Sequence, residues 1–417
     1  MTLDVERGLE SPTSASQPAL SRLITVDTHR FANEYWGEQP LLSTQGELGS
    51  DFSDLFSDTA VDELVAQRGL RTPFARMAHE GSVLAPARYT GSGGYGAEIA
   101  DQLDADKVLK EFADGATLVL QGLHRTWPQL GEFTRALVDD LGHPAQVNAY
   151  ITPASSRGFD PHYDVHDVFV LQIRGEKHWT IHEPVHPDPL ADEPWSQHAA
   201  AVAAQAKLPP FIDATFSPGD VLYLPRGWIH SATALGGMSI HLTIGVSART
   251  RYDIAQKLLA RAGTSRDLRR SLPLGLDRLD RDALTALVRE ASALLEEMLE
   301  DDATVAAAAR DLASAAVSSK RQEPVFPLST IDALGSLQEH TRISWREGLE
   351  ATIQRTGSTV VITLPRKSVS LPVEAADAVE LLFAGEIATA GHLQGLDTAS
   401  SLVVARRLLR EAILIAR

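Results

Sequence analysis

The sequence has no cysteine among its 417 residues, which excludes disulfide bonds and thiolate ligands for a metal. Histidine and carboxylate side chains are therefore the ligands to consider. No apolar run approaches the roughly 20 residues that cross a bilayer. Residues 1–20 are acidic, contain Ser and Pro, and lack the apolar segment of a signal peptide. The sequence thus predicts a cytoplasmic protein with no membrane partner.

Basic residues are in the minority, since 38 Lys and Arg stand against 55 Asp and Glu, giving a formal net charge of −17. Nucleic-acid binding depends on clustered cations, so this balance argues against a general nucleic-acid binder. It favours a basic partner, because opposite charges speed encounter, although an acidic surface also serves solubility alone. With 44% hydrophobic residues, the chain has enough apolar side chains for a sizeable core and two or three domains.

Two histidines and one aspartate carry the clearest functional signal. His162 and Asp164 form an HxD pair, and residues two apart in an extended strand face the same side. His230 follows a turn, a short apolar strand and a second turn, which predicts that it begins another strand. Two imidazoles and one carboxylate bind one face of an iron ion and leave the other open, as in non-haem Fe(II) oxygenases. We therefore predict an Fe(II) site.

A lysine between these ligands suggests a co-substrate. Two β-rich runs flank Arg174-Gly175-Glu176, which predicts a hairpin that turns Lys177 back toward the metal pocket. A lysine that faces inward needs an anion to offset its loss of hydration. In an Fe(II) oxygenase this anion is the distal carboxylate of 2-oxoglutarate, whose keto-acid end binds the metal before O2 does. No Walker loop, G-x-S-x-G or H-E-x-x-H motif offers a competing chemistry.

These residues resemble the JmjC-type ribosomal oxygenases, 2-oxoglutarate enzymes that hydroxylate side chains of ribosomal proteins. The resemblance covers about residues 22–250. The motif of the family falls on Asn148, Tyr150, His162, Asp164, Lys177 and His230.

The resemblance implies roles for the residues beside the metal ligands. Lys177 and Tyr150 would hold the 2-oxoglutarate tail, with Asn148 nearby. Thr243, on an apolar strand, is a further candidate for the pocket wall.

The expected fold class is α+β, with a JmjC double-stranded β-helix (jelly roll, cupin) core followed by a helical and a winged-helix domain. The predicted segments are a flexible tail over 1–21, the catalytic domain over 22–250, a helical domain over 251–320 and a winged-helix-like domain over 321–417. Residues 71–96 are expected to be irregular and to end in a mobile glycine-rich loop. Periodicity predicts helices over 51–68, 130–141, 282–299, 304–317, 373–383 and 400–416, a short helix within 385–396, and paired strands over 359–364 and 368–371.

Two partner predictions come from the later segments. An exposed apolar face on the helical domain would mark homodimerisation, as the resemblance implies, unless that face packs within the chain. The winged-helix-like segment has mixed charge and no dominant basic helix, which favours a protein contact over direct DNA binding.

The substrate is left open by the sequence. A basic ribosomal protein is the first hypothesis. The Ala-rich, Arg-over-Lys, Cys-free composition resembles that of bacterial proteins, and the resemblance to the family implies arginine as the modified residue for bacterial-type members and histidine for eukaryotic ones. Alternatives are a small peptide or secondary metabolite, a non-catalytic metal-binding scaffold, and histone demethylation, for which no chromatin-reading module is apparent. His166, Asp167, Arg174 and His241 are candidates for the substrate side of the pocket, or else ordinary surface and core residues.

Overall fold

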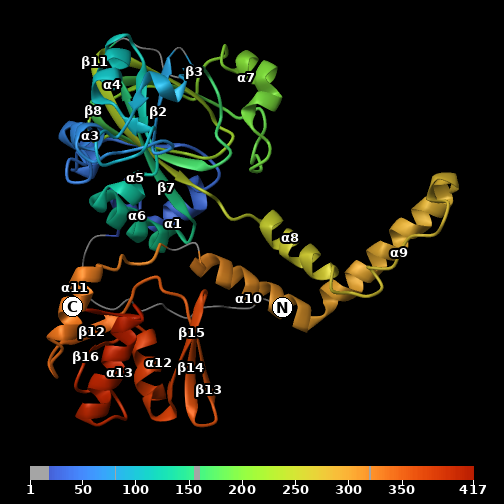
Figure 1. The fold of residues 1–417 in the computed structure, drawn as a ribbon. Coiled ribbons are helices and arrows are strands. Elements are labelled where there is room, and N and C mark those ends of the chain that lie inside the picture. Colours follow the sequence, from blue (N-terminus) through green and yellow to red (C-terminus); the bar gives the residue numbers. More distant parts are fainter. Residues whose placement is uncertain (1–17, 80, 155–159, 319–320) are drawn as a thin grey trace. The chain divides into compact units, whose positions relative to one another are not determined.

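The structure, a computed structural model, describes residues 18–79, 81–154, 160–318 and 321–417 (Figure 1). They form two compact units, the first ending at Arg249 and the second beginning at Thr250. Residues 1–17, most of the expected tail, lie outside the described residues. Leu20 from the end of that tail is buried, and its N–H donates to the Asp140 carboxylate at 2.8 Å. The folded part of the chain therefore begins before residue 21.

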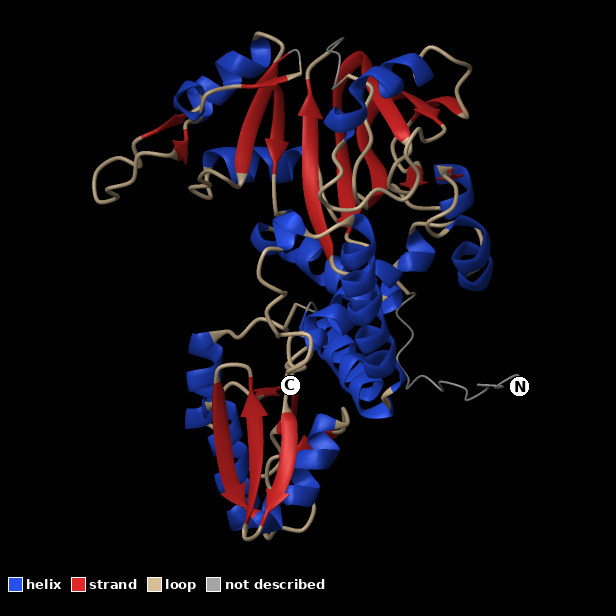
Figure 2. Cartoon of the chain, turned by 90° about the vertical axis from the view of Figure 1, so that its right-hand side faces the viewer, coloured by secondary structure: helices blue, strands red, loops and turns tan. Residues whose placement is uncertain are grey.

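The first unit is built on one antiparallel sheet of nine strands (Figure 2). The strand order is β1-β10-β8-β11-β7-β6-β2-β3, and β9 pairs with the second half of β8. The strands are β1 (Leu41–Ser43), β2 (Ala75–His79), β3 (Ser82–Val83), β6 (Thr117–Leu120), β7 (Ala145–Thr152), β8 (Asp167–His182), β9 (Ile212–Phe216), β10 (Val221–Leu224) and β11 (Ile229–Val246). A separate pair consists of β4 (Thr90–Gly91) and β5 (Gln102–Leu103). The mixture of this sheet with helices confirms the α+β class.

The two longest strands, β8 and β11, pair with each other on both sides of an interruption at residues 236–239 of β11. β8 continues through Gly175, which has a φ of 65°, while the register of β11 shifts between Leu235 and His241. The hairpin predicted at Gly175 is therefore wrong, because the residues on either side of it pair with β11 and not with each other. Lys177 nevertheless faces the pocket, since the continuing strand turns it inward.

Alternation along the strands separates a core face from a pocket face. Val147, Ala149 and Ile151 of β7 are buried in the large apolar cluster of the unit, so Tyr150 and Thr152 point to the opposite side. Helices supply the rest of that cluster. The helices of this unit are η1 (Leu20–Arg22), α1 (Thr28–Arg30), η2 (Phe31–Tyr35), α2 (Gln45–Leu48), α3 (Asp58–Ala66), η3 (Pro86–Arg88), α4 (Ala105–Ala113), α5 (Leu123–Thr126), α6 (Pro128–Leu141), η4 (Trp195–His198) and α7 (Ala199–Gln205).

The second unit begins with helices, as the sequence predicts. They are α8 (Arg251–Ala262), η5 (Leu276–Arg278), α9 (Arg281–Glu300) and α10 (Asp302–Ser318). The Asp280 side chain caps α9 by accepting from the N–H of Ala283 at 2.8 Å. Neither α8 nor α9 has a buried residue. Among the described residues, no helix has the length and apolar character needed to cross a membrane.

The remaining residues form a small α/β assembly around their own apolar cluster. Its elements are α11 (Pro327–Gly335), β12 (Arg342–Trp345), β13 (Thr352–Thr356), β14 (Thr359–Leu364), β15 (Lys367–Pro372), η6 (Val373–Ala375), α12 (Ala376–Phe383), β16 (Ile387–Thr389), α13 (Thr398–Arg410) and β17 (Leu414–Ala416). The strand pair β14–β15 agrees with the sequence. Two expectations are wrong: residues 385–396 contain a strand and no helix, and α13 ends at Arg410 because residues 414–416 pair with β12.

Candidate active site

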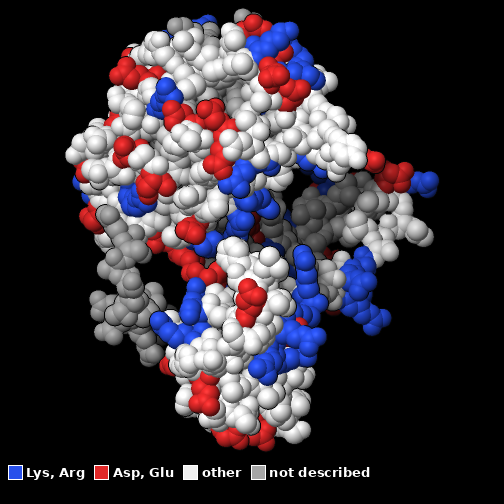
Figure 3. Space-filling model, turned by 60° about the vertical axis from the view of Figure 1, so that its left-hand side comes forward, with Lys and Arg blue, Asp and Glu red and all other residues white. Residues whose placement is uncertain are grey.

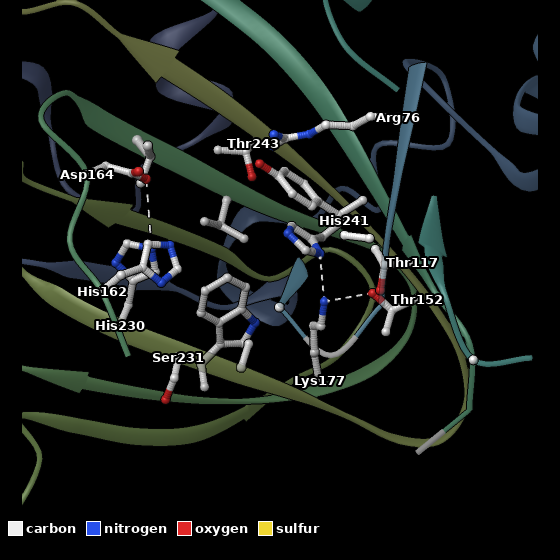
Figure 4. Close-up of a pocket in the computed structure, with 18 residues that line it drawn as sticks. Arg76, Thr117, Thr152, His162, Asp164, Lys177, His230, Ser231, His241 and Thr243 are labelled. Carbon is white, nitrogen blue, oxygen red and sulfur yellow. Dashed lines mark hydrogen bonds and ion pairs between the residues drawn. The ribbon is translucent and has the colours of Figure 1, made fainter. Parts of the chain in front are cut away.

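A cavity of about 270 Å³ opens on the face of β7 and β11 that points away from the large apolar cluster (Figure 4). It brings together most of the residues that the sequence predicts for the site. Those that line it are His162, Asp164, His230, Lys177, Tyr150 and Thr243. They come from β7, β8, β11 and the segment between β7 and β8, so residues far apart in the sequence meet in one place.

The backbone holds the three predicted metal ligands together. His162 and Asp164 lie outside any strand, contrary to the expectation, but His162 forms a β-bridge with His230 at the start of β11. The N–H of His162 donates to the carbonyl of His230 at 3.2 Å, and the reverse bond is 2.8 Å. The N–H of Gly227 donates to the Asp164 carbonyl at 3.0 Å. These bonds keep the HxD segment extended against β11.

The side chains of the three residues converge at one end of the cavity (Figure 4). The rings of His162 and His230 are 4.4 Å apart between centroids, and Asp164 Oδ2 lies 3.8 Å from His230 Nε2. Throughout the described part of the chain, no three His, Asp or Glu side chains already surround one point closely enough to hold a metal.

Backbone carbonyls orient both imidazoles. The Nδ1 of His162 lies 2.7 Å from the carbonyl oxygen of Asp160, and the Nδ1 of His230 lies 3.1 Å from that of Trp228. A carbonyl only accepts, so each Nδ1 carries the proton and each Nε2 keeps its lone pair for a metal. This arrangement, with the second ring nitrogen donating to a carbonyl, is usual for metal-binding histidines.

The charge state of His230 also suits a ligand. Burial, followed by the neighbouring His162, lowers the pKa of His230 to about 4. The imidazole is therefore neutral at pH 7 and does not have to lose a proton before it binds a cation. Together with the Asp164 carboxylate, these donors fit a divalent first-row metal with open positions.

Lys177 lies at the other end of the cavity and is 3% exposed. Its Nζ is 3.2 Å from Thr152 Oγ1 and 3.3 Å from His241 Nδ1, and no carboxylate within the described ranges pairs with it. Burial lowers the pKa of Lys177 to about 7. A buried amine whose neighbours are neutral is stabilised in its charged form when an anion binds beside it. The residues present therefore fit a carboxylate-bearing ligand such as 2-oxoglutarate.

Aromatic rings form the wall between the two ends. The ring of His241 stacks on Tyr150 with centroids 5.0 Å apart and an angle of 2° between planes, and meets Trp179 edge-on at 5.4 Å. Burial lowers the pKa of His241 well below its usual value, so it is neutral and can accept from Lys177. Burial also raises the pKa of Tyr150, as does the nearby Asp164 charge, so the phenol stays protonated. The wall thus offers neutral hydrogen-bonding groups.

The other two predicted residues have different positions. Thr243 of β11 lines the cavity, as expected. Asn148 does not line it; its Oδ1 accepts from the N–H of Gly122 at 3.0 Å. Asn148 therefore contacts the chain that precedes α5, on the same strand as Tyr150 but two residues away from it.

Several residues of the cavity were not predicted from the sequence. Those with polar or charged side chains are Arg76, Thr117, Thr152 and Ser231. Arg76 and Thr117 come from β2 and β6, and residues 71–96, which include β2, were expected to be irregular. The alternation of buried Ala75 and Met77 with Arg76 was the available signal.

Some candidates for the substrate side lie elsewhere. Asp167 is fully buried and accepts from the backbone N–H of Arg226 at 2.9 Å, while Arg174 pairs with Asp58 on the surface. Neither lines the cavity, and neither does His166. His241, in contrast, lies in its wall.

Comparison with known proteins finds similarity to the JmjC domain family and to ribosomal oxygenases. Residues 126–254 match the JmjC domain family. Ribosomal oxygenase 1 of Gallus gallus is 31% identical over 236 residues, which cover 56% of this chain and 37% of that protein. Ribosomal oxygenase 2 of Mus musculus is 31% identical over 240 residues, which cover 56% of this chain and 48% of that protein.

A third relative is the bifunctional lysine-specific demethylase and histidyl-hydroxylase NO66 of Aedes aegypti, 27% identical over 300 residues, which cover 66% of this chain and 44% of that protein. Each of these matches spans less than half of the relative's own length. Among solved structures, YcfD, a ribosomal oxygenase from Escherichia coli in complex with cobalt and succinic acid, has a TM-score of 0.50 at 16% identity, covering 95% of this chain and 99% of that one. At that identity the likeness concerns the fold alone.

Proposed function

We propose that this chain, whose residues 126–254 match the JmjC domain family and which is similar to ribosomal oxygenases 1 and 2, is a JmjC-type ribosomal oxygenase. In this proposal it is an Fe(II)- and 2-oxoglutarate-dependent oxygenase that hydroxylates an arginine or histidine side chain of a ribosomal protein. The observation that carries the proposal is the pairing of two features in one cavity. His162, Asp164 and His230 converge at one end, and the buried Lys177, with no carboxylate partner among the described residues, lies at the other.

Each residue has a role that follows from its surroundings. His162, Asp164 and His230 would hold Fe(II) through two Nε2 atoms and a carboxylate. Lys177 would bind the distal carboxylate of 2-oxoglutarate, supported by the Thr152 hydroxyl and by His241, which accepts from Nζ and keeps it in place. Tyr150 and Thr243 would supply neutral hydroxyl groups along the ligand.

When bound, Fe(II) supplies oxidising chemistry, in which O2 converts 2-oxoglutarate to succinate and CO2 and one oxygen atom enters a substrate C–H bond. The protein contributes geometry and water exclusion. The apolar side chains of Val168, Val170 and Trp179 line the same cavity and limit the access of water. The net charge of −17 favours encounter with strongly basic ribosomal proteins.

The test is anaerobic reconstitution with Fe(II) and 2-oxoglutarate, followed by addition of O2 with and without ribosomal proteins from the same source. Succinate release and a one-oxygen mass gain on a ribosomal protein are the readouts. Both should disappear in His162→Ala and should fall strongly in Lys177→Ala. His178→Ala changes a histidine next to Lys177 on β8 that does not line the cavity, so it is the matched control and should retain activity.

The outcomes separate the alternatives. Succinate release without any modified ribosomal protein would direct the search to a small peptide or metabolite. Metal binding without 2-oxoglutarate turnover would leave a scaffold that binds metal, and the oxygenase proposal would be wrong. Loss of a methyl group from a lysine, in place of oxygen gain, would point to demethylation.

We further propose that α8 and α9 mediate homodimerisation. Both helices lack buried residues, and large apolar side chains on them are exposed. Those with at least 39% exposure are Tyr252, Ile254, Leu259, Leu284, Val288 and Leu299. Exposed apolar side chains repeated along a helix are typical of a subunit interface.

The assembly from α11 to β17 is proposed to be a winged-helix-like domain that contacts protein and does not bind DNA directly. Arg407 of α13 pairs with Glu411, and Arg355 of β13 pairs with both Asp377 and Glu380 of α12. Cations that are already paired contribute less to phosphate binding. Acidic and basic side chains also occur together on the face drawn in Figure 3. We propose a cytoplasmic location, where ribosomal proteins are made.

A further inference from the structure

Arg76 is a cation of the cavity that the proposed roles leave unexplained. Its strand, β2, pairs with β6, and the neighbouring Ala75 and Met77 are buried in the apolar cluster. Alternation therefore turns Arg76 to the opposite face, where it lines the cavity. Figure 4 shows its side chain extending toward Thr243.

The guanidinium is held in place by neutral groups. It forms a hydrogen bond with the Tyr150 hydroxyl, and its buried Nε has no hydrogen-bond partner among the residues that the structure describes. Within the described residues, Arg76 forms no ion pair with a carboxylate. Its side chain is partly buried, so solvent screens its charge less than it would screen a surface arginine.

The charge balance of the loaded cavity follows from these positions. Arg76 and Lys177 are its two cationic side chains, and Asp164 is the one carboxylate among the described residues that line it. In the proposed complex the divalent metal and the dianionic 2-oxoglutarate cancel, and Asp164 offsets one cation. Among the described groups one positive charge remains, and Arg76 places it in the wall of the cavity that a substrate side chain has to enter.

We propose that Arg76 makes the loaded cavity select an uncharged substrate side chain, of the imidazole type, over a guanidinium or an ammonium group. The inference rests on the proposed function and is opposite to the preference for arginine that the resemblance to bacterial-type members implies. A cationic side chain would lose its hydration and meet a like charge without compensation. An imidazole brings no charge and can exchange hydrogen bonds with the hydroxyls of Tyr150, Thr243 and Ser231.

The expected size of the effect follows from Coulomb's law. Two like charges about 6 to 8 Å apart, at an effective dielectric constant of about 20, weaken binding by about tenfold or more. Neutral Arg76→Gln removes the repulsion, and Arg76→Lys retains it. Replacement of arginine by citrulline in the substrate removes the charge and keeps nearly the same shape, which separates charge from size.

The experiment measures peptide binding by fluorescence anisotropy to protein loaded with Mn(II) and 2-oxoglutarate without O2, so that the readout does not depend on turnover. Four labelled peptides share one flanking sequence of Gly, Ser and Lys and differ only in a central histidine, arginine, citrulline or lysine. Wild type should bind the histidine and citrulline peptides at least about tenfold more tightly than the arginine and lysine peptides. Arg76→Gln should reduce this ratio to about threefold or less, and Arg76→Lys should preserve it.

Three results would overturn the proposal. The arginine peptide could bind as tightly as the citrulline peptide, or none of the four peptides could bind. In the third, Arg76→Gln would leave unchanged the ratio of affinities between the neutral and the cationic peptides. An Arg76→Gln variant that weakens only 2-oxoglutarate would show that Arg76 binds the co-substrate instead. Succinate release by wild type without peptide tests the proposed function separately, because failure there concerns the metal and Lys177 and not the selection of a substrate.

Discussion

The backbones of His162 and His230 form a reciprocal pair of hydrogen bonds, with N–H to carbonyl distances of 3.2 and 2.8 Å. Residues 68 positions apart in the sequence are thereby fixed side by side before any ligand is present. Because the contact is made by the main chain, it does not depend on the identity of either side chain. The metal-binding chemistry and the local fold are therefore separable by mutation.

We expect Asp164→Asn to lose metal affinity without loss of fold. The amide has nearly the same shape, and the bond from Gly227 N–H to the backbone of residue 164 is kept, but the anionic donor is gone. Fe(II) or Mn(II) affinity, measured anaerobically by calorimetry, should fall by more than about tenfold. The melting temperature of the metal-free protein should change little. Asp213→Asn, which removes an exposed carboxylate paired with His178, is the control and should bind metal normally.

The affinity for 2-oxoglutarate should fall as the pH rises above 7. Burial lowers the pKa of Lys177 to about 7, so the free protein loses this proton above that pH, whereas a bound carboxylate holds it. Binding then takes up a proton, and Kd rises by up to about tenfold per pH unit until the pKa of the complex is reached. Below pH 7 the lysine is already charged, and affinity should level off. Calorimetry of 2-oxoglutarate binding to the Mn(II)-loaded protein, in buffers of different ionisation enthalpy, measures the number of protons taken up on binding.

Two variants check that Lys177 is the group responsible. Lys177→Arg keeps a charge at every pH tested, so its affinity should lose the pH dependence, while Lys177→Met should bind weakly throughout. A wild-type affinity that is constant from pH 7 to 9 would contradict the assignment. By linkage, the ligand-free wild type should gain stability between pH 7 and the usual lysine pKa of 10.5, because the unfolded chain binds the extra proton there.

The sequence predicted the chemistry of the cavity better than its geometry. The possible ligands are limited by the side chains of His162, Asp164 and His230 and by the lysine between them. This limit holds whatever the local secondary structure. Their placement depended on pairing between distant strands. His162 is extended because β11 bonds to it, and the segment from 174 to 176 is a continuous strand because β11 also pairs with both of its sides. Local patterns contain no information about such partners.

The position of Arg76 was also not predictable from the local sequence. Its strand is short, and a five-residue segment within a region rich in Gly and Pro gives little periodicity. Long helices were easier to predict, since α9 repeats apolar residues over 20 positions and begins at a capping aspartate. At the C-terminus, residues 414–416 continue the apolar spacing of α13, but pairing with β12 makes them a strand.

Gly175→Ala should destabilise the first unit more than an ordinary glycine replacement. Gly175 has a φ of 65°, and an added Cβ would overlap the backbone carbonyl oxygen of Met238 in the paired strand. We expect a loss of about 2–4 kcal/mol in the free energy of unfolding. Gly236→Ala is the matched control: its φ is 70°, but no atom of the described residues lies within 4 Å of the added Cβ. It should cost about 1 kcal/mol, the strain of the backbone alone.

Thermal and chemical unfolding of both variants, followed by tryptophan fluorescence, gives the comparison. Equal losses would mean that backbone strain dominates and that β11 can move away from Gly175. Such movement would shift Lys177, two residues further on, so the affinity for 2-oxoglutarate reports it independently.

Val288→Asp should weaken self-association if α9 lies in a dimer interface. Val288 is 65% exposed, on the same helix as the exposed Leu284 and Leu299, and a carboxylate there would be buried without a partner in the dimer. Dimerisation should weaken by about tenfold or more. Val403 of α13 has the same 65% exposure and gives the matched control, because Val403→Asp adds the same charge outside these helices.

Light scattering coupled to size-exclusion chromatography measures the mass of each variant. A dimer that survives Val288→Asp, or dissociates equally with Val403→Asp, would place the interface elsewhere.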